Sequence, residues 1–353
     1  MKNPFPTLGT SIAAAVGAGI ASAILFSLVN QVTVVAIALA YLSPLPIMIA
    51  VLGFGRIPGV IATAVAALTV FGIAIIQQPH EGRGAILDAA ALAGLTFVLS
   101  LGLPALWLSF LAALSRPKGS SSWSITVGAG RSFARDYCPL ERLLTYGVAI
   151  SATVAVAGTL YVSFRHGGFA ASLDLAEGAV APALEGLIGD LALPRGIDAH
   201  SIAQLIVLAT PPAVAASTLL MLTLNLWLAG RVAEVSGRLP RPWPDIPHEL
   251  GLPRTYALVF VAAAAGASFI GGVAALISAI VAAALGMGFA LQGLAVIHDL
   301  SRGLRFRTLL LTLVYVSLAL LMPWPLVPVA VLGLLDSAFS LRNRRQNKIS
   351  PKP

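Results

Sequence analysis

Residues 33–54 read TVVAIALAYLSPLPIMIAVLGF, a run of 22 residues without a charged side chain. A helix needs roughly 20 apolar residues to cross the ~30 Å hydrocarbon core of a bilayer, so this run is long enough to span it. Pro44 and Pro46 lie inside the run and remove two backbone N–H donors. The stretch therefore predicts a membrane segment in which some backbone carbonyls must find other partners.

Apolar blocks of similar character occupy most of the remaining chain. Across the whole sequence 58% of residues are apolar and only 10% are charged, whereas a soluble domain carries about 25% charged residues. We therefore predict an all-α fold, a polytopic transmembrane helical bundle. Its other apolar blocks are 10–29, 57–77, 85–113, 143–164, 202–229, 256–270, 273–297 and 308–341.

The basic residues follow a topological pattern. If the blocks are threaded across a membrane in turn, all but three of the 22 Lys and Arg residues fall in gaps on the side of the N-terminus. The exceptions are Arg83, Arg165 and Arg195. Cytoplasmic loops carry an excess of Lys and Arg, so the pattern predicts a multi-pass protein of the bacterial inner membrane with both termini in the cytoplasm. Attraction to anionic lipid accounts for the net charge of +8, so we expect the lipid bilayer and no nucleic acid as a partner.

The basic gaps also constrain the number of crossings, because two inner gaps require an even number of segments between them. Residues 256–299 must form a pair that turns at Gly271 and Gly272, and residues 308–341 must go out and return around Pro323–Pro325. Each arm of the second pair has about 16 residues, near the lower limit for spanning, so two full spans and a re-entrant hairpin both remain open. We predict about ten membrane segments, with eight or nine as the alternative.

Four stretches between or beyond the blocks have a predicted character of their own. Apolar residues recur at helical spacing in the outer gap 165–201 and predict an amphipathic helix there. This helix is either a lid over an outward cavity or, as we expect, an interfacial connection. The gap 115–141 is expected to be irregular, 238–253 to be extended because of its prolines, and 342–353 to be a basic cytoplasmic tail. The whole chain, 1–353, is predicted to form a single integral membrane domain. The stripe in the outer gap consists of Leu173, Val180, Leu184, Leu187, Ile188 and Leu191.

Polar or irregular groups at membrane depth mark candidate binding sites, because the bilayer normally excludes them. Prolines inside three apolar runs free carbonyls that need partners in neighbouring helices or in a ligand, and the alternative is a packing kink without a ligand. Gln292 shares a helix face with Asp299, a stripe that either lines a cavity or reaches the inner headgroups. For Asp336 the alternative is pairing with a nearby arginine, and Asn225 is expected to make a helix-to-helix hydrogen bond. The candidate ligand-binding residues are Ser43, Pro44, Pro46, Thr210, Pro211, Pro212, Gln292 and Asp336.

Small residues in the first segment recur every four positions at Ala13, Gly17 and Ala21. This spacing lets helices approach closely and predicts a packing face, against a helix of the same chain or of another membrane subunit. Two parallel stripes, which begin at Ala14 and Ala15, have the same spacing.

Signatures of enzymes are missing from the sequence. It has no GxSxG, HExxH, CxxC or GxxxxGK motif, and its His residues lie apart in different gaps and helix ends. Its one cysteine, Cys138, allows no intrachain disulfide and no paired thiol site. We expect no catalytic residues, no metal site and no cofactor, and a chain that is not an enzyme.

Three stretches resemble the YybS-like family of uncharacterised bacterial membrane proteins. They are Leu45-Pro46 followed by Gly53, Gly55 and Gly59; GMGFALQGLAVIH at 286–298; and LGLLD at 332–336, ahead of Arg342. That family is distantly similar in hydropathy to the S components of energy-coupling-factor vitamin transporters, which bind substrate and pair with an ATP-driven module. S components have fewer helices than the number predicted for this chain. The resemblance therefore implies a membrane protein of unassigned activity rather than a particular ligand.

Two functions are consistent with these features. The first, which we favour, is a small-molecule transporter or a substrate-binding transporter subunit, with its ligand among the proline-containing segments. The alternative is a non-transporting membrane partner or scaffold that assists another membrane complex. A polar pocket beside the prolines would support the first function, and a solidly packed bundle would count against it. An enzyme that acts on lipid would instead require two of Asp88, His298, Asp299 and Asp336 to lie within about 6 Å of each other.

Overall fold

A computed structural model of the chain describes residues 8–31, 33–77, 83–118, 124–125, 135–188 and 198–342. Almost all of these residues are helical. Seven of the described helical segments are long and apolar enough to cross a membrane, and three shorter apolar helices accompany them. The prediction of an all-α polytopic membrane protein is confirmed, and these segments agree with the predicted count of about ten. The long segments are Leu8–Gln31, Val34–Phe54, Arg56–Gln77, Gly84–Ala113, Leu140–Arg165, Ala199–Val235 and Gly272–Leu300; the shorter ones are Arg254–Phe269, Arg307–Leu321 and Leu326–Phe339.

The described chain divides into two compact units. Two helices, α7 (Leu140–Arg165) and α9 (Ala199–Val235), contribute residues to both. The single integral membrane domain expected over 1–353 stays a prediction. Unit 1 contains the described residues of Met1–Gly147 and Leu220–Asp245, and unit 2 contains those of Val148–Leu219 and Ile246–Pro353.

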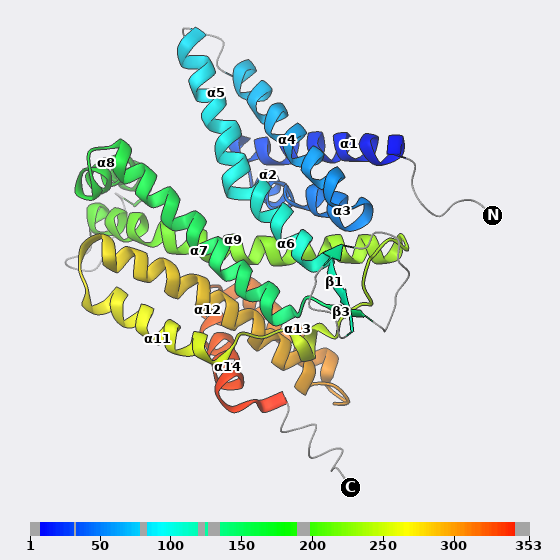
Figure 1. The fold of residues 1–353 in the computed structure, drawn as a ribbon. Helices are drawn as coiled ribbons and strands as arrows, with labels where there is room; N and C mark the ends of the chain where they lie inside the picture. The colour runs from blue at the N-terminus through cyan, green and yellow to red at the C-terminus, as the bar shows by residue number, and fades with distance from the viewer. Residues whose placement is uncertain are drawn as a thin grey trace. The chain divides into compact units, whose positions relative to one another are not determined.

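In unit 1, α1 (Leu8–Ser27) crosses and contacts α4 (Arg56–Gln77), as Figure 1 shows. The closest approach is at Gly19, where an added Cβ would lie 2.5 Å from the carbonyl oxygen of Ala62. The packing face inside this unit is therefore the predicted stripe that begins at Ala15, and a partner for the stripe of Ala13, Gly17 and Ala21 stays a prediction. Ser22 lies on the buried face, because its hydroxyl bonds to protein there instead of facing lipid. The buried face includes Ala15, Gly19 and Ala23, whereas Ala13, Gly17 and Ala21 are exposed or half-buried.

The other helices of unit 1 surround this pair. α3 lies against α1, α4 and α6, and α4 also contacts α5. A π-helical turn, η2, joins α5 to α6 without interrupting the long apolar segment that the sequence predicted over 85–113. These elements are η1 (Leu28–Gln31), α2 (Val34–Ala40), α3 (Leu45–Phe54), α5 (Arg83–Phe97), η2 (Val98–Gly102) and α6 (Leu103–Ala113).

The gap 115–141, which we expected to be irregular, contains a small antiparallel sheet. β1 (Leu114–Pro117) is the central strand, between β2 (Ser124–Ile125) and β3 (Arg135–Tyr137). Arg116 and Asp136 lie opposite each other in the register of β1 and β3, and their side chains form an ion pair at 3.3 Å. Oppositely charged cross-strand pairs stabilise such ladders, a signal that our reading of the sequence missed.

Unit 2 is organised around α12 (Gly272–Leu300), which lies against α11 (Arg254–Phe269) and α14 (Leu326–Phe339) (Figure 1). Glycines set the spacing between α12 and α14. An added Cβ would lie 1.9 Å from the Val329 oxygen if placed on Gly293, and 2.0 Å from the Phe289 oxygen if placed on Gly333. Small residues at such positions let two backbones touch. The other helices of the unit are α8 (Phe169–Ile188), α10 (Ile246–Glu249) and α13 (Arg307–Leu321).

Two turns that we predicted from glycine and proline are present at the predicted positions. α12 begins directly after Gly271, and Gly272 has a φ of +66°, a left-handed conformation that glycine adopts without strain. α13 ends at Leu321 and α14 begins at Leu326, so the predicted break around Pro323–Pro325 is present. The 15 residues of α13 extend over about 22 Å at the usual helical rise. Spanning and re-entrant arrangements of this pair therefore both stay open.

α9 has no break at its prolines, and one expectation, for the gap 238–253, is corrected. α9 continues through Pro211 and Pro212 without a break, and the hydroxyl of Thr210 donates to the carbonyl of Ile206 at 2.7 Å, one turn earlier. The gap 238–253 is not wholly extended, because it contains the short helix α10. Proline is tolerated in the first turn of a helix, where no N–H is needed from it.

The stretch that we predicted as an amphipathic helix in the gap 165–201 forms α8. One of its acids is not on an exposed face: the carboxylate of Glu177 is buried and lies 3.5 Å from Nε2 of His200, near the start of α9. Leu187, which belongs to the predicted apolar stripe, is 77% exposed, and Leu191 lies outside the described residues. The outer, interfacial position of the helix stays a prediction.

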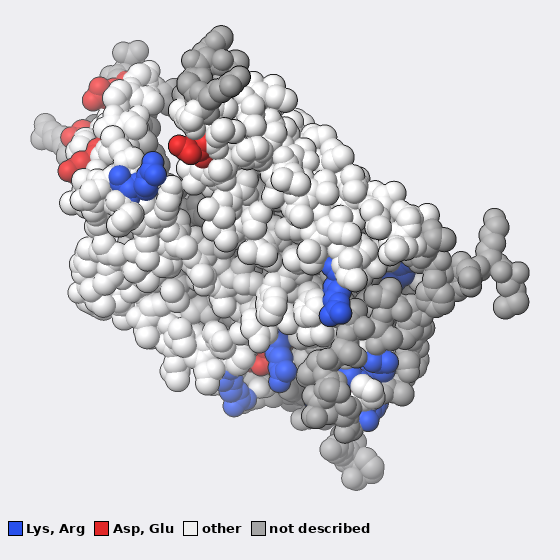
Figure 2. Space-filling view, turned by 45° about the horizontal axis from the view of Figure 1, so that its top comes forward, with Lys and Arg blue, Asp and Glu red and all other residues white. Residues whose placement is uncertain are grey.

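Large apolar side chains are exposed on both units. On α13, for example, Leu309, Leu313 and Leu320 are 59%, 61% and 76% exposed. A contiguous surface of this kind would promote association in water, whereas lipid solvates it. Most of the surface visible in Figure 2 is white and so carries neither acidic nor basic side chains. Together with the ten apolar helices, these surfaces are those of a multi-pass membrane protein.

Candidate functional site

The long apolar segment Val34–Phe54 is interrupted near its middle, between α2 and α3. We call residues 41–44 the helix break. Pro44 and Pro46 cannot donate backbone hydrogen bonds, so the regular ladder stops there. It is replaced by tighter bonds, from the N–H of Ser43 to the carbonyl of Ala40 at 3.0 Å and from Leu45 to Leu42 at 3.0 Å.

Side chains from two other helices bind the remaining carbonyls of the helix break. The hydroxyl of Ser22 on α1 donates to the Ser43 carbonyl. On α9, Nδ2 of Asn225 donates to the carbonyl of Tyr41 at 2.7 Å and to that of Met221 at 2.7 Å. The helix-to-helix hydrogen bond expected of Asn225 is therefore present, and it fixes a freed carbonyl inside unit 1.

Two oxygen atoms at the helix break have no hydrogen-bond partner among the residues that the structure describes: the hydroxyl Oγ of Ser43 and Oδ1 of Asn225. Both side chains are completely buried, at 0% exposure. The Oδ1 atom lies at the break because it shares a carbon with Nδ2, which is bonded to Tyr41 there. An unsatisfied buried polar group costs about 1–3 kcal/mol, so the break combines buried polar groups with unmet bonding capacity.

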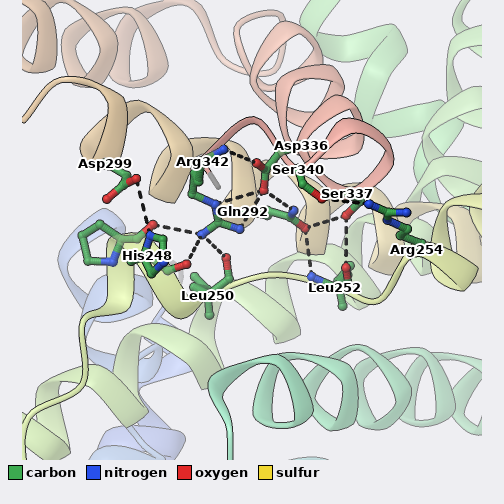
Figure 3. A network of polar contacts seen from close by, with 11 residues as sticks. His248, Leu250, Leu252, Arg254, Gln292, Asp299, Asp336, Ser337, Ser340 and Arg342 are labelled. Atoms are coloured by element: carbon green, nitrogen blue, oxygen red, sulfur yellow. Dashed lines mark hydrogen bonds and ion pairs between the residues drawn. The ribbon is translucent and has the colours of Figure 1, made fainter. Parts of the chain in front are cut away.

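A second polar cluster lies in unit 2, where Asp336 on α14 is bound by Arg342 (Figure 3). The acid is 5% exposed and the arginine 8%. The chain turns back between them at Ser340, whose φ of 52° and ψ of 53° are left-handed. The expected alternative for Asp336, pairing with a nearby arginine, is the arrangement found. Arg342 itself was expected to begin an open basic tail and is instead buried; residues 343–353 lie outside the described residues.

Arg342 also binds the segment that precedes α11. Its Nη1 lies 2.9, 2.8 and 2.9 Å from the carbonyl oxygens of Pro247, His248 and Leu250. One guanidinium therefore neutralises a buried carboxylate and binds three carbonyls in and just after α10. Buried charges are normally stable only when they are paired and hydrogen-bonded in this way.

Gln292 joins α12 to the same cluster, as Figure 3 shows. Its Nε2 donates to Oδ2 of Asp336 at 2.9 Å, and its Oε1 accepts from the N–H of Leu252 at 2.9 Å and from the hydroxyl of Ser337 at 3.1 Å. Each polar atom of this amide thus has a protein partner. We call the whole cluster the Arg342 network; it comprises Pro247, His248, Leu250, Leu252, Gln292, Asp336, Ser337 and Arg342.

The remaining polar candidates bind other partners. Asp299 lies 3.7 Å from Nδ1 of His248 and 3.4 Å from Nε of Arg302, while His298 is hydrogen-bonded to the Tyr315 hydroxyl at 2.9 Å. Asp88 is exposed on α5. Among the residues that the structure describes, no three His, Cys, Asp or Glu side chains are grouped so as to hold a metal ion.

The structure brings some of the predicted ligand-binding residues together and separates others. Gln292 and Asp336 are hydrogen-bonded in unit 2, and Ser43, Pro44 and Pro46 form the helix break and the first turn of α3 in unit 1. The predicted residues Thr210, Pro211 and Pro212 remain inside the continuous helix α9, where they are exposed or half-buried.

Three residues of these clusters were missed in the sequence. Ser22 and Ser337 are short hydroxyl residues in helices, where such residues are common, so neither stands out. Arg342 was assigned to the basic tail together with its basic neighbours. Its position six residues after Asp336 could have identified it as the arginine that pairs with this acid.

Comparison with known proteins adds a family to this picture. Residues 190–337 match the family described as "Predicted membrane protein (DUF2232)". No curated protein and no solved structure matches the chain. The resemblance to the YybS-like family and to S components stays a prediction. The matched stretch, which contains Asn225, Gln292 and Asp336, is thus similar to a family of membrane proteins of unknown function.

Proposed function

We propose that the chain is a small-molecule transporter, or the substrate-binding subunit of a transporter, in the bacterial inner membrane. Both termini lie in the cytoplasm, as the distribution of Lys and Arg indicates. Its partners are the lipid bilayer, a small-molecule ligand and another membrane subunit. It carries no catalytic residues, so transport draws on an ion gradient or on a separate energy-coupling subunit.

The observation that supports this proposal is the helix break with its two unpartnered oxygens, Ser43 Oγ and Asn225 Oδ1. Irregular backbone at membrane depth is tolerated only where it is buried in protein or lines a cavity. Discontinuous helices near the middle of the bilayer are also where many transporters bind their substrates. The unmet hydrogen bonds raise the free energy of this closed arrangement relative to one in which water or a ligand reaches the two atoms.

A second function has its own support. The stripe Ala13, Gly17 and Ala21 stays exposed or half-buried on α1, and the Arg342 network is satisfied without a ligand. Both features suit a scaffold that binds another membrane protein through α1 and does not transport. In that case the helix break never opens.

Access of water to the helix break separates the two functions. Because Cys138 is the one cysteine of the chain, a Cys138→Ser background allows a single reporter thiol to be introduced as Ser43→Cys. The matched control is Ser109→Cys, since Ser109 on α6 is also 0% exposed in unit 1 but its hydroxyl is bonded to the Ala105 carbonyl. Each variant is treated in native membranes with a charged methanethiosulfonate and analysed by mass spectrometry.

For a transporter we expect the thiol of the Ser43→Cys variant to react at least about tenfold faster than that of the Ser109→Cys variant, a difference of about 1.4 kcal/mol in opening free energy. Equal and negligible labelling of both variants would contradict the proposal and favour the scaffold. Native mass spectrometry of the wild-type chain in mild detergent then identifies a co-purified small molecule, which the Asn225→Ala variant should lose.

A further inference from the structure

We infer that the helix break binds a small monovalent cation, for which Na⁺ is the probe. The inference rests on the proposed function, because it names what occupies the break in a transporter. Unwound carbonyls and the C-terminal ends of interrupted helices are general means of coordinating Na⁺ in membranes. What singles out a cation here is the kind of atom that is left without a partner.

Both unpartnered atoms are oxygens, and the orientation of the Asn225 amide is fixed. Its Nδ2 has two hydrogens and two carbonyl acceptors, Tyr41 and Met221. If the amide were flipped, Oδ1 would face two carbonyl oxygens, which cannot donate a hydrogen bond. Because an amide oxygen can only accept, any partner of Oδ1 must be electropositive.

Further oxygens at the helix break can complete the coordination. The carbonyl oxygens of Tyr41 and Ser43 each accept one side-chain hydrogen bond, from Asn225 and Ser22 respectively. A carbonyl oxygen has two lone pairs, so each retains acceptor capacity. The candidate ligands of the ion are therefore four oxygens of residues 41, 43 and 225, each with a lone pair that no hydrogen bond among the described residues uses.

The same stretch is poorly suited to an anion. Helix N-termini bind anions through free backbone N–H groups, but two of the four positions from Pro44 to Ile47 are prolines without an N–H. The charge of the cation is also limited. No Asp or Glu occurs in 3–55 or in 202–230, and divalent Ca²⁺ and Mg²⁺ bind mainly through carboxylates. Neutral oxygens alone therefore point to a single positive charge.

Size narrows the choice further. Oγ of Ser43 and Oδ1 of Asn225 are both sealed from solvent in this arrangement, which favours a small ion over a large organic amine. A dehydrated Na⁺ is smaller than a water molecule and needs only the oxygens already present. The ion would enter when the break opens and would stabilise the closed arrangement afterwards.

The test measures how the Tm of the full chain in detergent depends on the ion present. Unfolding is monitored by tryptophan fluorescence. Total ionic strength is held constant while Na⁺ replaces choline, with K⁺ as a second comparison. Ser43→Ala removes one coordinating oxygen that makes no hydrogen bond in the protein, so this variant should fold at least as well as the wild type without Na⁺. Ser109→Ala is the matched control at a buried serine with a satisfied hydroxyl.

For the wild type and for Ser109→Ala we expect Tm to rise by about 2 °C for each tenfold increase in Na⁺ above its Kd, with a smaller rise in K⁺. For Ser43→Ala we expect no dependence on Na⁺. A wild-type Tm that is equal in Na⁺ and choline, or an equal Na⁺ shift in the Ser43→Ala variant, would overturn the cation site. If the Ser43→Cys thiol is labelled while Na⁺ has no effect on Tm, the proposed cation site is rejected and the proposed transport function is retained.

Discussion

Nε and Nη2 of Arg342 both donate to a single oxygen of Asp336, Oδ2, at 3.0 and 2.7 Å. The same oxygen accepts a third hydrogen bond, from Gln292. The second carboxylate oxygen, Oδ1, accepts from the backbone N–H of Arg342 at 3.3 Å. Three parts of unit 2, namely α12, α14 and the segment before α11, are therefore held together through one buried ion pair.

Replacing Asp336 by Asn should strongly destabilise the chain, because Arg342 would keep its charge in a buried position without a counter-charge. Breaking a buried pair by removing one partner costs about 3–5 kcal/mol. We expect a large fall in Tm in detergent, whereas Asp174→Asn, at an exposed acid of the same unit, should change stability by less than about 0.5 kcal/mol. A similar loss for both variants would show that the pair is not responsible.

The double variant Asp336→Leu with Arg342→Met should be less destabilised than the sum of its two single variants. Removing both charges leaves neither one unpaired, and buried pairs replaced by apolar residues are often tolerated. A double-mutant cycle in thermal or chemical unfolding gives the coupling energy. Strict additivity of the two single effects would contradict direct pairing.

Replacing Gln292 by Met should cost less than losing Asp336, but the loss should still be measurable. Methionine fills similar space, yet the Leu252 N–H loses its acceptor and Ser337 keeps only the Leu252 carbonyl. An unsatisfied buried donor costs about 1–3 kcal/mol. Amide hydrogen exchange should show faster exchange at Leu252 in particular; unchanged protection there would rule out the assigned role of Gln292.

Gly293→Ala should push α12 away from α14, because the new Cβ would overlap the Val329 carbonyl oxygen. Backbone atoms cannot move aside as a side-chain end can, so we expect a loss of about 1–3 kcal/mol. The matched control is Gly178→Ala in α8, which meets nothing within 4 Å and should gain up to about 1 kcal/mol in helix propensity. Equal Tm changes of the same sign in both variants would contradict close packing at Gly293.

Cys138 should react slowly with alkylating reagents in the folded chain. Burial raises the pKa of its thiol above the ordinary value of 9.0, and the nearby cations Arg241 and Arg142 offset only part of this effect. Since the thiolate is the nucleophile, the rate of alkylation should still be rising with pH at 9.0, while the thiol of the unfolded chain is already half ionised there. If the alkylation rate of the folded chain reached its plateau at a lower pH than that of the unfolded chain, the thiol would not be desolvated.

Local rules explain what the sequence could predict. Properties of neighbouring residues determine the length of each apolar run, the turns at Gly271–Gly272 and Pro323–Pro325, and the helix break that begins at Tyr41. Membrane insertion makes these rules strict, because a backbone group without a local partner is costly in lipid.

What the sequence could not predict depends on contacts between distant residues. Asn225 and Tyr41 are 184 positions apart, and nothing near either of them indicates the other. α1 offered three equivalent stripes of small residues, and the buried one is known only from its contact with another helix, as at Gly19 against Ala62. Pro211 and Pro212 do not break α9. Whether proline kinks or breaks a helix depends on the neighbours of the helix as much as on its own residues.

The Arg342 network also has an order in time. A chain leaves the ribosome from its N-terminus, so the carbonyls of 247–250 are made first, Gln292 next, Asp336 later and Arg342 last. The carboxylate of Asp336 is therefore synthesised before its counter-charge, and α14 reaches the membrane while its acid is still unpaired. The Arg342 network can therefore be completed only once residue 342 has emerged, so its ion pair closes from the C-terminal side.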